Sequence, residues 1–203
     1  MTILKHNDQS GRSMVEMLGV LAIIGVLSVG GISGYSKAMA KFKLIKAQDQ
    51  ITMLLMNIRA AYATSPTYDG LNANTAAEYN LAPSEMIAEG TSGKTLYGAF
   101  GGQVVLGATG GTGESGKTYF HIRMTGLGKE ACRSLATSDW GADGLVSMVV
   151  KGGANDAEAK VSCTSVPATS GAGTWCVADF PATLQEANQA CNGEINSIDW
   201  MYY

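Results

Sequence analysis

Apolar residues dominate the first part of the chain. Between Glu16 and Lys37 there are 20 residues without a formal charge, and most of them are apolar. As an α-helix that rises about 1.5 Å per residue, this run would extend roughly 30 Å, which matches the hydrocarbon thickness of a bilayer. The pattern therefore predicts a helix that crosses a membrane or packs among other apolar helices.

The helical pattern continues beyond this run. From about residue 35 onward, apolar residues recur at spacings near three and four, with charged and polar residues between them. A single helix over residues 13–63, ended near Pro66, would be roughly 75 Å long. Its first half needs lipid or other helices around it, and its second half needs a globular head. Three glycines lie close together in this helix, Gly30, Gly31 and Gly34, and each costs about 1 kcal/mol of helix stability relative to alanine. A bend or local melting of the helix is therefore expected there.

The rest of the chain mixes short helical and strand patterns, which predicts an α+β protein. Residues 118–124 alternate between apolar and polar side chains, and a glycine-rich loop separates them from an apolar strand over 103–106, so a hairpin is expected. Residues 68–71, Tyr-Asp-Gly-Leu, are typical of a turn. The other expected elements are short helices over 75–79, 83–88, 128–137 and 182–191, and strands over 145–150 and 195–203.

Glu16 is a single acidic residue at the start of the apolar run. A carboxylate in apolar surroundings costs a few kcal/mol, so a cationic partner is expected. Cleavage after Gly11 would supply one, because the new α-amine of Arg12 would lie four residues before Glu16. The same amine on a neighbouring copy could also pair across subunits. The Arg12 side chain is a weaker alternative, since Arg four residues before Glu contributes only a few tenths of a kcal/mol.

A short leader that ends in glycine, a glutamate five residues later and an apolar helix together resemble the class III signal of the type IV pilin and pseudopilin superfamily. The resemblance implies cleavage between Gly11 and Arg12 by the prepilin peptidase, a membrane aspartic peptidase. It also implies N-methylation of Arg12 and a role for Glu16 in docking each subunit to its neighbour. Arg12 stands where this family usually has Phe, Met or Leu.

Two other interpretations of the N-terminal segment are open. A conventional secretory signal would be removed after a small-residue site beyond the apolar core, at Ser33 or Gly34, which would leave Glu16 without a role. A plain signal-anchor helix would keep residues 1–11 attached.

Four cysteines, all beyond the apolar run, indicate an oxidising compartment. An even number in a chain with an export signal favours two disulfides, with three possible pairings. Zinc is disfavoured because there is no CxxC motif and the only histidines are His6 and His121. The lysines after the apolar run would, by the positive-inside rule, place the C-terminal part in the cytoplasm. The cysteines and the family resemblance favour the opposite orientation, with the head in the periplasm.

The order of elements after the long helix resembles that of the type IVb subclass. Segments 100–104 and 127–135 are similar to their counterparts in the bundle-forming and toxin-coregulated pilins and their enterotoxigenic and plasmid relatives. The resemblance implies the type IV pilin fold, a long helical spine packed on an antiparallel sheet. It also implies a Cys132–Cys191 disulfide, which leaves Cys163–Cys176 as a local clip. In the chain-entropy model these closures contribute about 4 and 3 kcal/mol.

The chain is expected to have four parts: a leader over residues 1–11, a membrane-spanning or filament-core half of the long helix over 12–35, an amphipathic half of that helix over 36–65, and a globular head over 66–203.

One stretch matches a nucleotide-binding motif. Residues 111–118, Gly-Thr-Gly-Glu-Ser-Gly-Lys-Thr, fit the phosphate-binding pattern GxxxxGK[ST]. That mechanism requires a following helix whose N-terminus faces the phosphates, whereas the alternation after residue 118 predicts a strand. Residues 93–95 repeat Gly-Lys-Thr in another polar loop, which points to composition as the source. No nucleotide or other cofactor is expected.

No other arrangement of residues predicts catalysis or nucleic-acid binding. His121 is expected on the surface of a strand, loop aspartates are expected to cap turns, and tryptophans are expected to pack rather than form an adhesive surface. A net charge of −3 without a basic aromatic patch disfavours nucleic acid. The aspartates and tryptophans are Asp139, Asp143, Asp156, Trp140, Trp175 and Trp200.

The sequence therefore favours a structural protein and not an enzyme. The resemblance implies the major subunit of a type IVb-like pilus, held in the inner membrane as a precursor and then polymerised with its own copies into an extracellular filament. The implied partners are the prepilin peptidase, the inner-membrane pilus assembly machinery and a host or recipient cell surface, for adhesion, bundling or conjugative mating. The alternatives are a minor pilin or type II secretion pseudopilin, and a membrane-anchored binding domain that does not polymerise.

Overall fold

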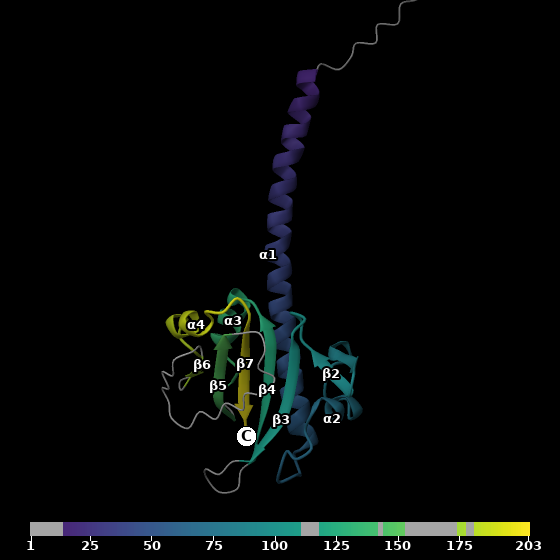
Figure 1. Cartoon of the computed structure of the whole chain (residues 1–203), viewed down its shortest axis with the longest axis vertical. Helices are drawn as coiled ribbons and strands as arrows, with labels where there is room; N and C mark the ends of the chain where they lie inside the picture. The colour runs from purple at the N-terminus through teal and green to yellow at the C-terminus, as the bar shows by residue number, and fades with distance from the viewer. Residues whose placement is uncertain (1–13, 111–117, 142–143, 153–173, 178–180) are drawn as a thin grey trace, which may run out of the picture. The chain divides into compact units, whose positions relative to one another are not determined.

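The structure, a computed structural model, describes residues 14–110, 118–141, 144–152, 174–177 and 181–203. The chain divides into two compact units, the first ending at Lys41 and the second covering Phe42–Tyr203. Each unit is described by itself below (Figure 1).

The N-terminal helix α1, Met14–Ala61, begins in the first unit and ends in the second. Its 48 residues correspond to about 72 Å at the usual rise per residue, so the single long helix expected from the periodicity is confirmed. The helix is continuous through Gly30, Gly31 and Gly34, and the local melting expected there is absent. Three glycines cost only about 3 kcal/mol, and the helix-forming residues on both sides of them offset this.

The second unit contains a seven-stranded antiparallel sheet in the order β1-β2-β3-β4-β7-β5-β6. The strands are β1 Ile87–Gly90, β2 Gly93–Tyr97, β3 Gln103–Gly110, β4 Thr118–Leu127, β5 Leu145–Gly152, β6 Thr174–Val177 and β7 Asn196–Tyr202. The helices of this unit, besides the end of α1, are α2 Ala73–Glu78, the 3-10 turn η1 Ser84–Met86, α3 Lys129–Ala136 and α4 Leu184–Ala190.

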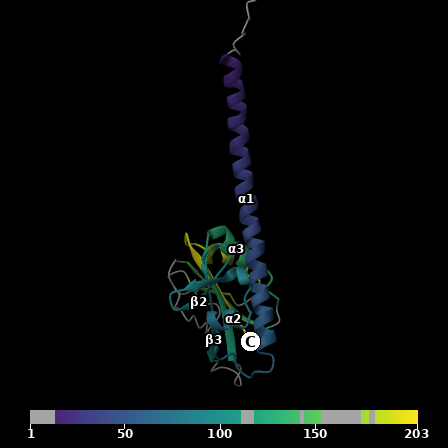
Figure 2. The same cartoon turned by 90° about the vertical axis from the view of Figure 1, so that its right-hand side faces the viewer.

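One face of the sheet packs against the second half of α1 (Figure 2). Strand alternation places every second residue on this face, and the register pairs Ile122 of β4 with Trp200 of β7, both fully buried. The helix supplies side chains at spacings of four, three and four, which is the stripe that a helix needs to bury one face. They are Ala47, Ile51, Leu54 and Ile58, all fully buried.

Aromatic rings fill the centre of this core. The Tyr68 ring lies 4.6 Å from that of Phe120, which stacks at 5.6 Å on Tyr202. Trp140 meets Trp200 edge to face at 4.9 Å. Trp140 and Trp200 therefore pack in the core, as expected, whereas the side chain of Trp175 is outside the described part of the chain.

The opposite face of the sheet carries a buried ion pair. Arg123 and Asp199 are register partners on β4 and β7, and the guanidinium donates from Nε at 2.9 Å and from a terminal nitrogen at 2.7 Å to Asp199 Oδ2. Burial raises the pKa of Asp199, while the nearby His121 and Arg123 act in the opposite direction. Both side chains are more than four-fifths buried, so neither charge can exchange its partner for water.

A disulfide joins the two short helices. Cys132 of α3 and Cys191, which ends α4, are bonded with their Cα atoms 5.8 Å apart, and both are fully buried. This is the pairing implied by the family resemblance. A capping box begins α4: Thr183 Oγ1 accepts from the Glu186 N–H at 3.3 Å, and Glu186 accepts from the Thr183 N–H at 2.8 Å.

Most of the expected elements are confirmed, with four exceptions. The sequence pattern missed strands β1, β2 and β6, and the helix expected over 83–88 is reduced to the turn η1 and runs directly into β1. Strands β1 and β2 are short, contain glycine and carry the charged pair Glu89 and Lys94, so they lack the alternation that marks a strand. They form because β3 offers an edge to pair with.

Candidate functional site

The exposed apolar surface of the first unit is its dominant feature. We define the apolar segment as residues 14–35, in which every side chain is exposed. Among the residues that the structure describes, α1 is the single helix long and apolar enough to cross a membrane, and none of its apolar window is buried. The large exposed side chains are Met14, Val15, Met17, Leu18, Val20, Leu21, Ile23, Ile24, Val26, Leu27, Val29, Ile32 and Tyr35.

The size of this surface decides what it can do. Full burial of one Val, Leu or Ile side chain is worth about 1.5–3 kcal/mol, so covering the segment would stabilise an association by well over about 10 kcal/mol. A surface of this kind marks a membrane or protein interaction. The apolar segment is therefore built to lie in lipid, among other helices, or in each in turn.

Glu16 lies in the first turn of α1 and is exposed. A carboxylate at this position interacts favourably with the positive end of the helix dipole. Glu16 forms no hydrogen bond or ion pair with any residue that the structure describes. Gly11 and Arg12, the other two residues that the signal singles out, lie outside the described residues, so their roles stay predictions.

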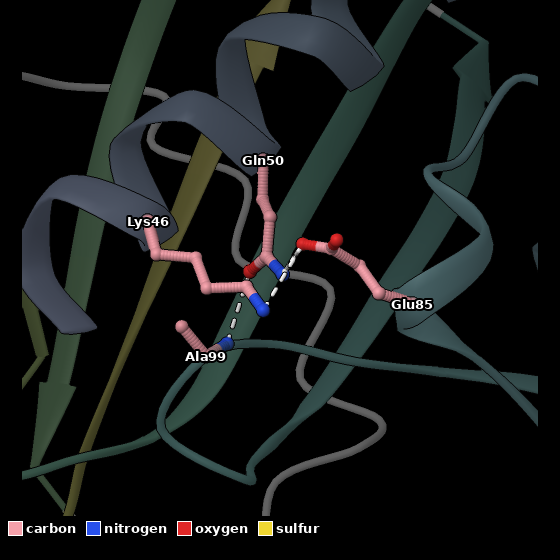
Figure 3. Close-up of polar contacts among 4 residues, drawn as sticks. All are labelled: Lys46, Gln50, Glu85 and Ala99. Carbon is pink, nitrogen blue, oxygen red and sulfur yellow. Dashed lines mark hydrogen bonds and ion pairs between the residues drawn. The ribbon is translucent and has the colours of Figure 1, made fainter. Parts of the chain in front are cut away.

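A polar cluster fixes the second half of α1 to the loop region before β3 (Figure 3). The Gln50 side chain is 3% exposed, accepts from the Ala99 N–H at 2.9 Å and donates to Glu85 at 3.2 Å. Lys46 pairs with the same carboxylate at 3.2 Å, and its hydrogen bond, followed by that of Gln50, lowers the pKa of Glu85. Gln50 satisfies a backbone group that burial would otherwise leave unpaired.

Sequence reasoning did not find this cluster. The one available signal is that Gln50 interrupts the otherwise apolar face formed by Ala47, Ile51 and Leu54. A polar residue inside such a face indicates a buried partner, but the partner comes from 35 and 49 residues further along the chain.

The nucleotide-binding motif is followed by a strand and not by the helix that its mechanism requires. Residues 111–117 lie outside the described part, but Thr118–Leu127 is strand β4, hydrogen-bonded to β3 as a hairpin. A phosphate-binding loop needs a helix N-terminus at this place. The strand expected after residue 118 is therefore confirmed.

The other candidates for chemistry have structural roles or are not described. Asp139 accepts from the Gly141 N–H at 2.9 Å, so it caps a turn. Asp143, Asp156 and Cys163 lie outside the described residues. Cys176 lies on β6 and is the register partner of Val149 on β5, and its proposed bond to Cys163 stays a prediction. Within the described ranges, no group of three or more His, Cys, Asp or Glu side chains is placed to hold a metal ion.

The long N-terminal helix, the antiparallel sheet on its second half and the disulfide between two short helices define the type IV pilin fold. The type IVb pilin from Salmonella typhi superposes with a TM-score of 0.54 at 15% identity, over 76% of this chain and 95% of that chain. TcpA, a type IV pilin from Vibrio cholerae El Tor biotype, gives 0.56 at 18% identity, over 79% of this chain and 99% of that chain. At these identities the likeness establishes the fold.

A family model gives the assignment within this class. The model described as PilS N terminal matches residues 43–201, and the chain therefore belongs to this family of type IV pilins, most like the type IVb group. Pilins are structural subunits and not enzymes. A search of curated protein sequences gave no match. The family match begins at Lys43, beyond the apolar segment.

Proposed function

We propose that this chain is the major subunit of a type IVb-like pilus. The supporting observation is the apolar segment, 22 residues of helix in which every side chain is exposed. The second unit has a hydrophobic core of its own, so the apolar segment is not needed to complete it. In the precursor, this segment lies in the inner membrane with the head in the periplasm. In the filament, the segments of neighbouring copies replace the lipid and form the filament core.

The prepilin peptidase cleaves the precursor between Gly11 and Arg12, and Arg12 is then N-methylated. The new amino group neutralises Glu16, on its own chain or on the adjacent one, as subunits leave the membrane. This exchange is favourable because a carboxylate without a partner in apolar surroundings costs a few kcal/mol. The inner-membrane assembly machinery drives the step, and the heads form the filament surface that contacts a host or recipient cell in adhesion, bundling or mating.

Replacement of Glu16 by alanine tests the docking step. We expect a stable, membrane-inserted subunit but few filaments, because the neighbour's amine loses its partner. The matched control is Asp49→Ala, which removes another exposed acid from the same helix. Filaments are counted by electron microscopy and by the amount of subunit in the sheared fraction. Normal piliation in Glu16→Ala would remove the docking role.

Intact-mass measurement of the purified chain tests the processing. The expected mass is that of residues 12–203 with one methyl group and two disulfides. A chain that still begins at Met1 would identify a membrane-anchored protein, and one that begins beyond Ser33 would identify a conventional secreted protein. Either result overturns the pilus proposal.

The abundance of the subunit separates the major pilin from its alternatives. A major subunit dominates the protein sheared from the cell surface. A minor pilin or a type II secretion pseudopilin carries the same signal but is a small fraction of that material, and its loss alters filament number or secretion instead.

A further inference from the structure

Two exposed lysines, Lys37 and Lys41, follow the apolar segment on α1, and both belong to the first unit. Because they are four residues apart, they lie on the same side of the helix, with their Cβ atoms about 6 Å apart. Their side chains form no hydrogen bond or ion pair with a described residue, whereas Lys46, further along the helix, pairs with Glu85. The first unit therefore carries two adjacent positive charges that no described side chain neutralises.

The helix itself cannot supply a counter-charge for these lysines. The sequence has no acidic residue between Glu16 and Asp49, so no carboxylate stands three or four residues from either lysine. Like charges at this spacing repel each other, and an anion that contacts both of them would remove the repulsion. The pair is therefore suited to an anionic ligand from outside the chain.

The position of the two lysines on the helix identifies the source of that anion. The apolar segment extends about 33 Å at the usual rise per residue, which fills the hydrocarbon core of a bilayer. Its last residue, Tyr35, is 67% exposed, and tyrosine is enriched where a membrane meets water. Lys37 and Lys41 follow about 3 Å and 9 Å further along the helix axis, at the level of the lipid headgroups.

The direction of the helix turns both side chains toward the membrane. In an α-helix every Cα–Cβ bond tilts toward the N-terminus, and for these lysines that is the direction of the apolar segment. Gly34 lies on the same face, three residues before Lys37. Apart from the backbone of the helix itself, no described atom lies within 4 Å of the place where a Gly34 Cβ would be. The lysine side chains can therefore extend along the helix surface to headgroups at the end of the apolar segment.

We propose that Lys37 and Lys41 together bind the phosphate of an anionic phospholipid headgroup, at the surface of the membrane that holds the apolar segment. The phosphate oxygens accept charge-assisted hydrogen bonds from both ammonium groups. The site rests on the membrane-inserted precursor of the proposed function, but it does not require polymerisation. It also gives a role to two lysines that the positive-inside rule would not place on the periplasmic side.

Native mass spectrometry of the full-length chain tests the lipid preference. The chain is released from a non-ionic detergent that contains equal amounts of phosphatidylglycerol and phosphatidylcholine with the same acyl chains, so that only the headgroup differs. We expect the bound lipid to be mainly phosphatidylglycerol. Equal retention of the two lipids would overturn the proposal. Displacement of phosphatidylglycerol by added inorganic phosphate would assign the lysines to a soluble anion and would overturn it as well.

Substitutions locate the preference. Lys37→Gln/Lys41→Gln is expected to lower the ratio of bound phosphatidylglycerol to bound phosphatidylcholine about 25-fold, since each lysine near an anionic surface contributes about fivefold. Lys37→Arg/Lys41→Arg should preserve the ratio, because a guanidinium group also binds phosphate. The matched control, Lys94→Gln/Lys129→Gln, removes the same charge from exposed positions of the second unit and should leave the ratio unchanged. Equal losses in the first variant and the control would reduce the preference to net charge and reject the site.

Acidic side chains of a second copy would give a different result. The single subunit would then retain both lipids equally, which overturns the lipid site. The lipid ratio is measured on single subunits and needs no filaments. A subunit that prefers phosphatidylglycerol through its lysines but never forms filaments would reject the pilus proposal alone. A subunit that assembles normally but retains both lipids equally would reject this site alone.

Discussion

Both halves of α1 contain many apolar residues, but only the second half buries a set of them within the chain. Leu27, in the apolar segment, is 68% exposed, whereas Leu54, in the second half, is fully buried against the sheet. The difference is in the pattern: the second half is apolar along one stripe, and the apolar segment is apolar on every side. A helix with one apolar stripe can bury that stripe against the sheet of its own chain. A helix that is apolar on every side can be covered only by lipid or by other chains.

The comparison also separates two kinds of stability. The head is stabilised by its own core, ion pair and disulfide, whereas the apolar segment gains its stability from partners outside the chain. All three tryptophans, Trp140, Trp175 and Trp200, lie in the second unit. Tryptophan fluorescence during urea unfolding of the full-length chain in detergent therefore reports on the head alone, and the predictions below use it.

The largest expected effect comes from breaking the buried ion pair. Arg123→Met leaves the Asp199 carboxylate buried without its guanidinium, which should lower the free energy of unfolding by about 3–5 kcal/mol at neutral pH. The remaining carboxylate has a raised pKa, so the folded form favours its protonated state, and the loss should shrink as the pH falls below that pKa.

The double variant Arg123→Met/Asp199→Leu is the control for this prediction. It removes both charges and should recover most of the lost stability, because a buried ion pair contributes little beyond a well-packed apolar pair. Equal destabilisation in the single and double variants would show that Arg123 acts through packing instead of charge.

Loss of the Cys132–Cys191 bond should have the next largest effect. Replacing both cysteines by alanine opens a closure of 59 residues and should lower the free energy of unfolding by about 4 kcal/mol. The matched pair is Cys163→Ala/Cys176→Ala, for which the shorter proposed closure predicts about 3 kcal/mol. No change in the second double variant would contradict the Cys163–Cys176 bond.

A pair of identical substitutions tests the two halves of α1 directly. Leu54→Ala creates a cavity in the head core and should lower the free energy of unfolding by about 3 kcal/mol. Leu27→Ala, which changes an exposed position, should leave head unfolding unchanged and should reduce the yield of filaments instead. A change in head unfolding with Leu27→Ala would mean that the two halves are not energetically separate.

The smallest expected effect concerns the capping box of α4. Thr183→Ala should lower the free energy of unfolding by about 1 kcal/mol at pH 7. The Thr183 side-chain and backbone hydrogen bonds lower the pKa of Glu186. Their contribution to the free energy of unfolding is therefore present above the ordinary pKa of glutamate, and it is lost as the pH falls through the lower pKa of the folded state. The difference between wild type and variant should therefore narrow in acid, and a constant difference would show that the Glu186 charge has no part in the cap.

The sequence by itself determined the elements whose patterns are long and local. The periodicity from Met14 to Ala61 gave the long helix, the alternation after Thr118 gave β4, and the family resemblance gave the Cys132–Cys191 pairing. These signals are strong because helix and strand periods repeat over many residues, and burial of one face requires that repetition.

Only the tertiary structure decided which distant segments meet. Strands β1, β2 and β6 form because neighbouring strands offer edges to pair with. Gln50 finds Glu85 and Ala99, and the turn at Asp69 meets the end of α1, because the sheet packs on the helix. Such contacts join residues far apart in the chain, and their free energy depends on the geometry of the packed core, which no local pattern of residues encodes.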